Sequence, residues 1–286
     1  RFQAIDLRWG VSEEAALAQQ TMKICLSEIE RCQKTSPRPN FIVLLGNRYG
    51  WRPLPFEIPS DEFEQIISLV TKEEKELLEQ WYRRDDNALP PVHLLQSRGG
   101  EFVEYENWEK IETRLRQIFL SVLQNLSLSP DTAFKYTTSA TEQEIVAGEL
   151  KVQDANEHVF GFFREVVALL QDSEDFGNPD AEAAQKQKEL RGRLKEQLPG
   201  NIHEYTARWQ GDGPSLDHLD QLCEDVYADL SRVILAEISH LESVDPLDKE
   251  IAAHNDFGKD HARVFIGRTE LLKSIADYIN WNDSHP

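Results

Sequence analysis

The sequence predicts an α/β protein built around a parallel sheet, and three features indicate this class. A strand, a helix and a second strand follow one another within the first 45 residues. The second strand, Phe41–Leu45, is continuously apolar and ends at Gly46. A third apolar run, His158–Phe163, follows after a long intervening segment. Such runs are typical of strands buried on both faces of a parallel sheet.

The first three elements form an expected βαβ unit with a right-handed crossover. Phe2–Leu7 is short and partly alternating, which favours a strand. Ser12 is the expected N-cap of a helix that continues to about Cys32, and acidic residues occupy its first turn. Two prolines at positions 37 and 39 then end the helix before Phe41–Leu45.

Residues 51–138 differ from this pattern, and we interpret them as a helical insertion. Apolar residues recur at helical spacing over Asp61–Arg84 and again over Glu101–Leu126. Asn87–Gly100 contains Pro-Pro and Gly-Gly pairs, which predict a loop.

The remaining chain predicts further helices and two strands. Ser139 caps a helix over Thr141–Val152, and His158–Phe163 is a strand. A polar helix, a short strand and a long apolar-striped helix are expected at Ala181–Gln197, Ile202–Trp209 and Leu216–Leu241. The last forty residues predict a short helix, a turn at Gly267 and a final helix over Thr269–Trp281.

The composition excludes several classes of protein. The net charge is −20, with 31 basic and 51 acidic residues, so direct binding to nucleic acid or to an anionic membrane is disfavoured. The first 50 residues are slightly basic, with 7 basic and 5 acidic side chains. Three cysteines, no signal peptide and no long apolar run indicate a reducing compartment, so we expect a cytoplasmic location.

Three features are expected to meet beyond the carboxyl ends of the strands, where open α/β sheets bind ligands. The first loop supplies Asp6, Arg8, Trp9 and Gly10, and the second supplies Gly46, Arg48, Tyr49, Gly50 and Trp51. The third is the helix start after Ser139, with Glu142 and Glu144. Arginines suit phosphates, and aromatic rings can stack on a base. The simpler alternative is that the arginines pair with nearby acids and the tryptophans plug the end of the sheet.

Motifs for other chemistries are missing from the sequence. It contains no Walker A loop, no G-x-G-x-x-G, no H-E-x-x-H and no G-x-S-x-G. The eight histidines are scattered, so we expect no metal site. Cys25 and Cys32 are two helical turns apart, too far for a disulfide, and are expected to be core thiols.

The two loops carry a family resemblance. Phe2–Val11 and Phe41–Pro53, with Ser139-x-Thr-Glu-x-Glu-Ile145 and the strand end at Phe163–Glu165, resemble the TIR-like N-terminal domain of large NACHT and WD-repeat proteins. Telomerase protein component and nephrocystin-like proteins carry relatives of it. The resemblance covers residues 1–165 and extends to about 243. It implies a three-layer, TIR-like or flavodoxin-like parallel sheet with a helical insertion and C-terminal helices.

That family opens with a further strand and helix, which have no counterpart before Phe2 in this sequence. We therefore expect a sheet that lacks its first strand and helix, exposes an edge and is poorly stable alone unless another element fills the gap. The expected domains are 1–243, with the insertion at 51–138, and 244–286.

Residues 244–286 resemble the lead-in to a NACHT/STAND NTPase domain. The resemblance is carried by Glu250, His254, Phe257, Arg263, Phe265–Arg268, Leu271 and Ile275–Ile279. Gly267 and Arg268 form an expected turn near a nucleotide. The P-loop itself is absent, so ATP and Mg²⁺ are expected only in the domain that follows in that family, and this chain carries no cofactor.

The resemblance implies two functions. The first is an effector or adaptor module of a signalling STAND NTPase, which acts through protein partners or self-assembly. The alternative is an N-glycosidase for NAD or a nucleoside, with Glu142 as the catalytic residue and Glu144 and Glu62 as weaker candidates. Arg8 and Arg48 would then hold the phosphates of a small anionic nucleotide. Many relatives have no shown activity, which favours binding over catalysis. A structural segment without a ligand is the third interpretation.

Overall fold

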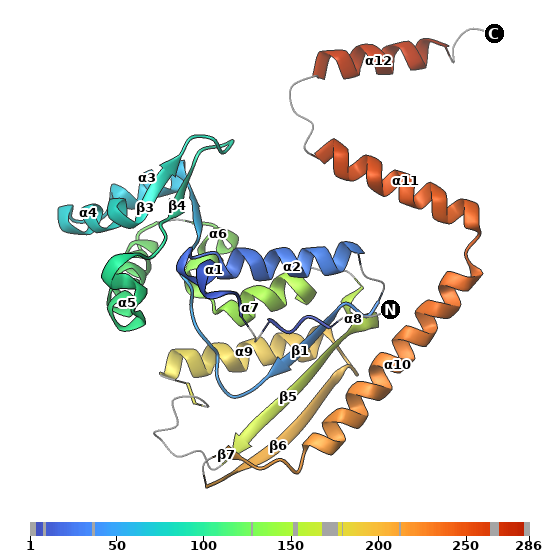
Figure 1. Ribbon diagram of the computed structural model, residues 1–286, viewed down its shortest axis with the longest axis horizontal. Helices are drawn as coiled ribbons and strands as arrows, with labels where there is room; N and C mark the ends of the chain where they lie inside the picture. Colours follow the sequence, from blue (N-terminus) through green and yellow to red (C-terminus); the bar gives the residue numbers. More distant parts are fainter. Residues whose placement is uncertain are drawn as a thin grey trace. The chain divides into compact units, whose positions relative to one another are not determined.

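The computed structural model describes residues 4–7, 10–35, 38–126, 128–150, 154–167, 177–178, 180–211, 213–263 and 269–282. The chain divides into two compact units, Arg1–Ile234 and Leu235–Pro286, which are described separately (Figure 1).

A four-stranded sheet forms the centre of the first unit. Its strands are β1 (Phe41–Leu45), β5 (Val159–Val167), β6 (Ile202–Gln210) and β7 (Gly213–Pro214), in the order β1-β5-β6-β7. The first three run parallel, and β7 pairs antiparallel with the end of β6. The predicted α/β class with a mostly parallel sheet is therefore confirmed.

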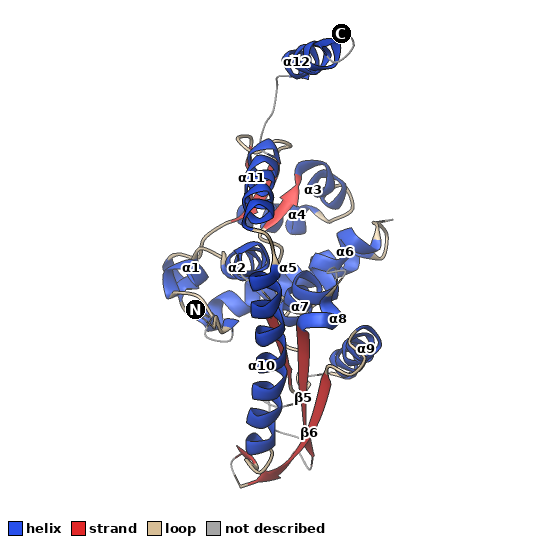
Figure 2. Ribbon diagram, turned by 90° about the vertical axis from the view of Figure 1, so that its right-hand side faces the viewer, coloured by secondary structure: helices blue, strands red, loops and turns tan. Residues whose placement is uncertain are grey.

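Helices cover both faces of this sheet and produce three layers (Figure 2). Side chains alternate between the two faces along β5, as the pleat requires. Val159 and Phe163 pack against buried Leu190 and Leu194 of α9 (Ala181–Gln197) and against Leu198, which directly follows this helix. Phe160 and Phe162 face α10 (Leu219–Ser243), which contributes Val233 to the second core cluster.

The predicted first strand is wrong over its described part. Residues 4–6 are irregular and Leu7 lies in a short 3-10 turn, while Phe2 and Gln3 lie outside the described residues. β1 is consequently an edge strand of the sheet. Ile42 and Leu44 are 37% and 46% exposed, so the prediction of burial on both faces is also wrong for this strand. On β5 and β6, the corresponding face is covered by α10, which packs on Phe160, Phe162 and Tyr205.

The helix predicted from Ser12 to Cys32 is two helices. Ser12 caps α1 (Glu13–Leu17) as expected, because its Oγ accepts a hydrogen bond from the amide of Ala15 at 3.3 Å. The chain then breaks at Gln19, whose φ is +60°, before α2 (Thr21–Thr35). A left-handed residue cannot continue a right-handed helix.

The insertion is a mixed α/β lobe with its own core. It contains α3 (Ser60–Ile67), α4 (Lys72–Trp81), α5 (Tyr105–Leu123), α6 (Pro130–Thr137), a 3-10 turn at Gly100–Val103, and strands β2 (Glu57–Pro59), β3 (Tyr82–Asp85) and β4 (Val92–Leu95). The strands form an antiparallel sheet in the order β2-β4-β3. The four helices and their shared apolar core agree with the expected helical character.

Two details of the predicted insertion are wrong. The single helix over Asp61–Arg84 breaks where Thr71 and Glu74 form a capping box, which starts α4. The predicted loop over Asn87–Gly100 contains the strand β4. Its first and last residues, Val92 and Leu95, are buried in the lobe.

After the insertion, α7 (Ala140–Ile145) continues into a π-helical segment at Val146–Leu150. The predicted helix to Val152 therefore changes type, and its last two residues lie outside the described part. A short helix, α8 (Ala155–His158), leads into β5.

The second unit contains the end of α10 and helices α11 (Pro246–Arg263) and α12 (Thr269–Asn282). The final helix is confirmed, whereas the predicted turn at Gly267, with Arg268, lies outside the described residues. Every described helix is too short or too polar to cross a bilayer.

Candidate functional site

The loop after β1 places Tyr49 at the carboxyl end of the sheet. Asn47 fastens this loop to β5, because its amide exchanges two hydrogen bonds with the backbone of Val166 at 2.8 and 3.1 Å. The Tyr49 amide donates to Asn178 Oδ1 at 2.7 Å. Tyr49 is 1% exposed, so its hydroxyl points into the protein rather than into solvent.

The first turn of α7 supplies the acidic group that meets Tyr49. The Ser139 hydroxyl caps this helix by accepting a hydrogen bond from the amide of Glu142 at 3.2 Å. The amide of Ala140 donates to the carbonyl of Trp51 at 2.8 Å, which joins the helix start to the β1 loop. Gly50 lies between them with φ +95°, a conformation that favours glycine.

The carboxylate of Glu142 is buried and has two strong donors. The hydroxyl of Tyr49 and the guanidinium of Arg193 both hydrogen-bond to it. The Tyr49 oxygen also accepts from the Ser139 amide at 3.2 Å. Burial and the adjacent Glu142 raise the pKa of Tyr49, so the phenol remains a donor at neutral pH. The carboxylate is therefore held in a fixed orientation by two groups from separate segments, the loop after β1 and α9.

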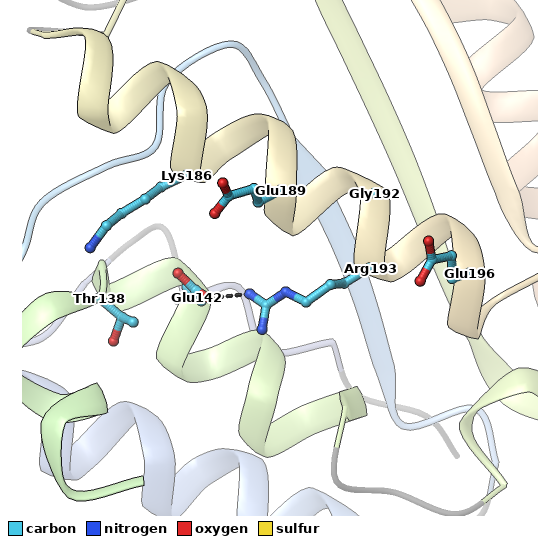
Figure 3. Close-up of a pocket in the computed structure, with 7 residues that line it drawn as sticks. All are labelled: Thr138, Glu142, Lys186, Glu189, Gly192, Arg193 and Glu196. Atoms are coloured by element: carbon cyan, nitrogen blue, oxygen red, sulfur yellow. Dashed lines mark hydrogen bonds and ion pairs between the residues drawn. The ribbon is translucent and has the colours of Figure 1, made fainter. Parts of the chain in front are cut away.

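A pocket of about 500 Å³ opens beside this carboxylate. Figure 3 shows α9 along one side and the start of α7 facing it, with the Arg193–Glu142 pair between them. Both signs of charge line the pocket, which is formed by Thr138, Glu142, Lys186, Glu189, Gly192, Arg193 and Glu196.

Two cationic side chains lie near the ring of Tyr49, whose hydroxyl donates to Glu142. Lys186 Nζ and the Arg52 guanidinium lie 6.0 and 5.6 Å from the centre of the Tyr49 ring. Lys186 also donates to the carbonyl of Thr137 at 2.5 Å. Such an arrangement can attract an anionic group while the carboxylate accepts a hydroxyl hydrogen or stabilises a developing cation.

The other two candidate glutamates lie in different environments. Glu144 faces α2, where the thiol of Cys25 hydrogen-bonds to it; burial raises the pKa of both groups, that of the thiol to about 11. Glu62 is buried in the insertion and receives hydrogen bonds from the Tyr136 hydroxyl and from Lys135 Nζ. Neither glutamate lines the pocket. Of the three candidate glutamates, Glu142 is therefore the one that lines it.

The predicted loop residues divide in a similar way. Arg48 is exposed, and the Trp51 indole donates to Glu112 Oε1 of α5 at 2.9 Å. Asp6 is half-buried and Gly10 is exposed, and neither lines the pocket. Arg8 and Trp9 lie outside the described residues. The second loop and the helix start therefore meet as expected through Tyr49, Gly50 and Trp51.

Helix α9 contributes residues to the site that the sequence did not predict there. Gly46 receives hydrogen bonds through its carbonyl from Gln187 and Arg191, at 2.7 and 2.8 Å, which fastens this helix to the β1 loop. Lys186 and Arg193 then face the pocket. Their spacing of seven residues, two helical turns on one face, was the available signal. Across the described ranges, no three His, Cys, Asp or Glu side chains gather closely enough to hold a metal ion.

Similar proteins were found among curated sequences. NACHT domain- and WD repeat-containing protein 1 of Mus musculus is 29% identical over 310 residues, covering 99% of this chain and 20% of that protein. NACHT and WD repeat domain-containing protein 2 of Homo sapiens is 26% identical over 327 residues, covering 97% and 18%. Telomerase protein component 1 of Rattus norvegicus is 39% identical over 56 residues, covering 20% and 2%.

These matches confirm the resemblance seen in the sequence. The homologues of this chain are NACHT and WD-repeat proteins and, over a shorter segment, telomerase protein component 1. The chain spans about a fifth of the length of the first two relatives, and so corresponds to a region of a multidomain protein. No protein-family model matches the chain, and no solved structure matches it.

Proposed function

We propose that this chain is an effector or adaptor region of a cytoplasmic signalling NTPase of the STAND kind, and that it acts by self-assembly. The observation that carries the proposal is an exposed apolar stripe on α12. Leu271, Leu272, Ile275, Tyr278 and Ile279 are 48–61% exposed. They recur at helical spacing, so they form one stripe.

A second copy of the chain is the occupant that we propose for this stripe. Amphipathic helices with apolar residues at this spacing bury them by pairing with one another. The relatives extend well beyond the region matched here and combine NACHT and WD-repeat domains, so the helix lies in a chain with several other folded parts. Pairing through α12 would bring copies of those parts together.

The full-length protein tests this proposal by its oligomeric state. Ile275→Gln should lower the assembled fraction in light scattering, because it places a polar amide in the apolar stripe. Asp277→Gln is the matched control, since it introduces the same residue on the opposite, exposed face of α12 and should leave assembly unchanged. Equal assembly by both variants would reject the stripe as the contact, and a monomer throughout would reject self-assembly.

The geometry around Glu142 favours a second candidate function, an N-glycosidase acting on NAD or a nucleoside. A buried carboxylate that borders a pocket, with lysine and arginine nearby, is suited to an oxocarbenium-like centre attached to a phosphate. In this TIR-like reaction the bond between C1′ and the base nitrogen breaks, and the base leaves with the electron pair. Water adds to C1′ and loses a proton.

Incubation of the assembled full-length protein with NAD, followed by chromatography for nicotinamide, tests the second function. Glu142→Gln should abolish the product, because an amide cannot stabilise the cationic centre. Glu106→Gln changes an exposed carboxylate on α5 that does not line the pocket and should retain activity. Unchanged turnover by Glu142→Gln would reject this site, and no product from the wild-type protein would reject the function.

A further inference from the structure

Arg193 occupies the carboxylate that the second proposed function requires. One oxygen of Glu142 accepts a hydrogen bond from the hydroxyl of Tyr49, and the other pairs with the guanidinium of Arg193. Figure 3 shows the Arg193 side chain extending from α9 toward this carboxylate, and both residues line the pocket. A ribose that is to contact the Arg193-bound oxygen of Glu142 must therefore compete with the guanidinium for it.

The two partners of Glu142 differ in their freedom to move. Tyr49 is 1% exposed, and its oxygen is also held by the Ser139 amide at 3.2 Å. The side chain of Arg193 is 45% exposed, whereas that of Glu142 is 8% exposed. A partly solvated charge loses less hydration when it changes partners than a buried one does. Tyr49 is thus the fixed anchor of the carboxylate, and Arg193 is the partner that a ligand can displace.

Helix α9 offers Arg193 space and alternative neighbours. A Cβ added to Gly192 would have no atom within 4 Å, so the surface beside the base of Arg193 is open. Glu189 and Glu196 lie four residues before and three residues after Arg193, spacings at which the side chains of one helix can pair. Both are exposed and line the same pocket. The guanidinium therefore has anionic neighbours on its own helix when it leaves Glu142.

The charges of the pocket favour one kind of competitor for Arg193. A guanidinium presents a planar fork that matches the oxygens of a phosphate, and Lys186 supplies a second cation two helical turns away in the same pocket. Glu189 and Glu196 oppose any anion, so a phosphate gains most where it replaces Glu142 as the partner of Arg193. Arg48, which was expected to hold phosphates, is not among the residues that line the pocket.

We propose that Arg193 determines which ligands this site accepts: it blocks Glu142 in the free protein and transfers to the phosphate of a phosphorylated ribose when that ligand enters the pocket. Glu142 then remains anchored by Tyr49 and is free to face the ribose. A nucleoside has no phosphate to draw Arg193 away, so the site selects nucleotides over nucleosides. This inference rests on the second proposed function, whose substrate class it narrows.

Calorimetric titration of the full-length protein with ADP-ribose, and with adenosine as the probe without phosphate, tests the inference without requiring activity. Arg193→Gln should weaken the binding of ADP-ribose roughly tenfold to a hundredfold, because a charge-assisted contact is lost. Arg31→Gln is the matched control, since it removes an arginine that pairs with Glu28 on α2, and it should bind as the wild type does. Unchanged affinity in Arg193→Gln would overturn the proposal, as would equal affinities of the wild type for ADP-ribose and adenosine.

A second pair of variants tests the blocking contact itself and does not depend on the folding of Arg193→Gln. Inorganic pyrophosphate is the probe, because it has no ribose that could contact Glu142. Glu142→Gln releases Arg193 and should tighten the binding of pyrophosphate. Glu196→Gln removes the same charge from the pocket but leaves the Arg193–Glu142 pair in place, so its gain should be smaller. Equal gains, or a loss of affinity in Glu142→Gln, would overturn the proposal.

The activity arm separates this inference from the function on which it rests. If the full-length protein releases nicotinamide from NAD, Arg193→Gln should raise KM without lowering kcat, because it removes the phosphate contact together with the block on Glu142. A lower kcat in this variant would mean that Arg193 merely supports Glu142, and would overturn the proposal. If the wild-type protein forms no product, the glycosidase function fails, while the two binding experiments still decide the role of Arg193.

Discussion

Glu149 of the π-helical segment is 1% exposed and its carboxylate has no hydrogen-bond partner among the described residues, and this leads to a quantitative prediction about stability and pH. Its pKa is raised from 4.5 to about 7 in the folded protein, because burial disfavours the charged form. The folded state therefore binds a proton more tightly than the unfolded state between these two values. The contribution of Glu149 to stability is therefore expected to fall as the pH rises from 4.5 to about 7, and to level off above that range.

Glu149→Gln is the perturbation that isolates this effect. Glutamine has nearly the same shape and remains neutral at every pH, so it removes the cost of burying a charge. The difference between the two pKa values corresponds to about 3 kcal/mol, at 1.36 kcal/mol for each pKa unit. The variant should therefore match the wild-type chain below pH 4.5 and exceed its free energy of unfolding by up to about 3 kcal/mol above pH 7.

Urea unfolding, monitored by circular dichroism at a series of pH values, measures this difference. Glu196→Gln is the control, since Glu196 lines the pocket from an exposed position on α9 and its replacement should not depend on pH in this way. A stability gain that is the same at acidic and neutral pH would refute the reasoning. So would a loss at neutral pH, because it would mean that ionised Glu149 stabilises the fold.

Further substitutions test the packing and the helix start. Gly148→Ala would place a Cβ 2.7 Å from the ring of Phe41 and should lower the free energy of unfolding in urea by about 1–3 kcal/mol. In the control, Gly192→Ala, the new Cβ on α9 would have no atom within 4 Å, so this variant should gain about 0.5–1 kcal/mol. Equal effects of the two variants would contradict this packing. Leu190→Ala should lower the free energy of unfolding by about 2–5 kcal/mol, because this fully buried residue joins α9 to the sheet, and a loss below 1 kcal/mol in calorimetry would argue against that contact. Ser139→Ala removes the cap of α7 and should cost about 0.5–2 kcal/mol in thermal unfolding, an effect that Ser139→Asp should largely restore.

Local signals in the sequence were sufficient for the elements that carry a strong pattern. The strands predicted at Phe41–Leu45 and His158–Phe163 correspond to β1 and, from Val159 onward, to the start of β5. The serines before α1 and α7 act as caps, since a hydroxyl acceptor and the free amides of a first turn suffice for that role. The strands β2, β3 and β4 were missed because each has only three or four residues, too few to establish an alternating period.

For the candidate site, the sequence by itself determined that Glu142 begins a helix behind a capping serine, and that Tyr49 follows the end of a strand. Only the tertiary structure decided that these two side chains meet, that Arg193 joins them from 51 residues away, and that Glu62 and Glu144 do not line the pocket. The physical reason is that helix periods and caps depend on neighbours within a few residues, whereas the partner of a buried charge depends on which distant segments the sheet brings together.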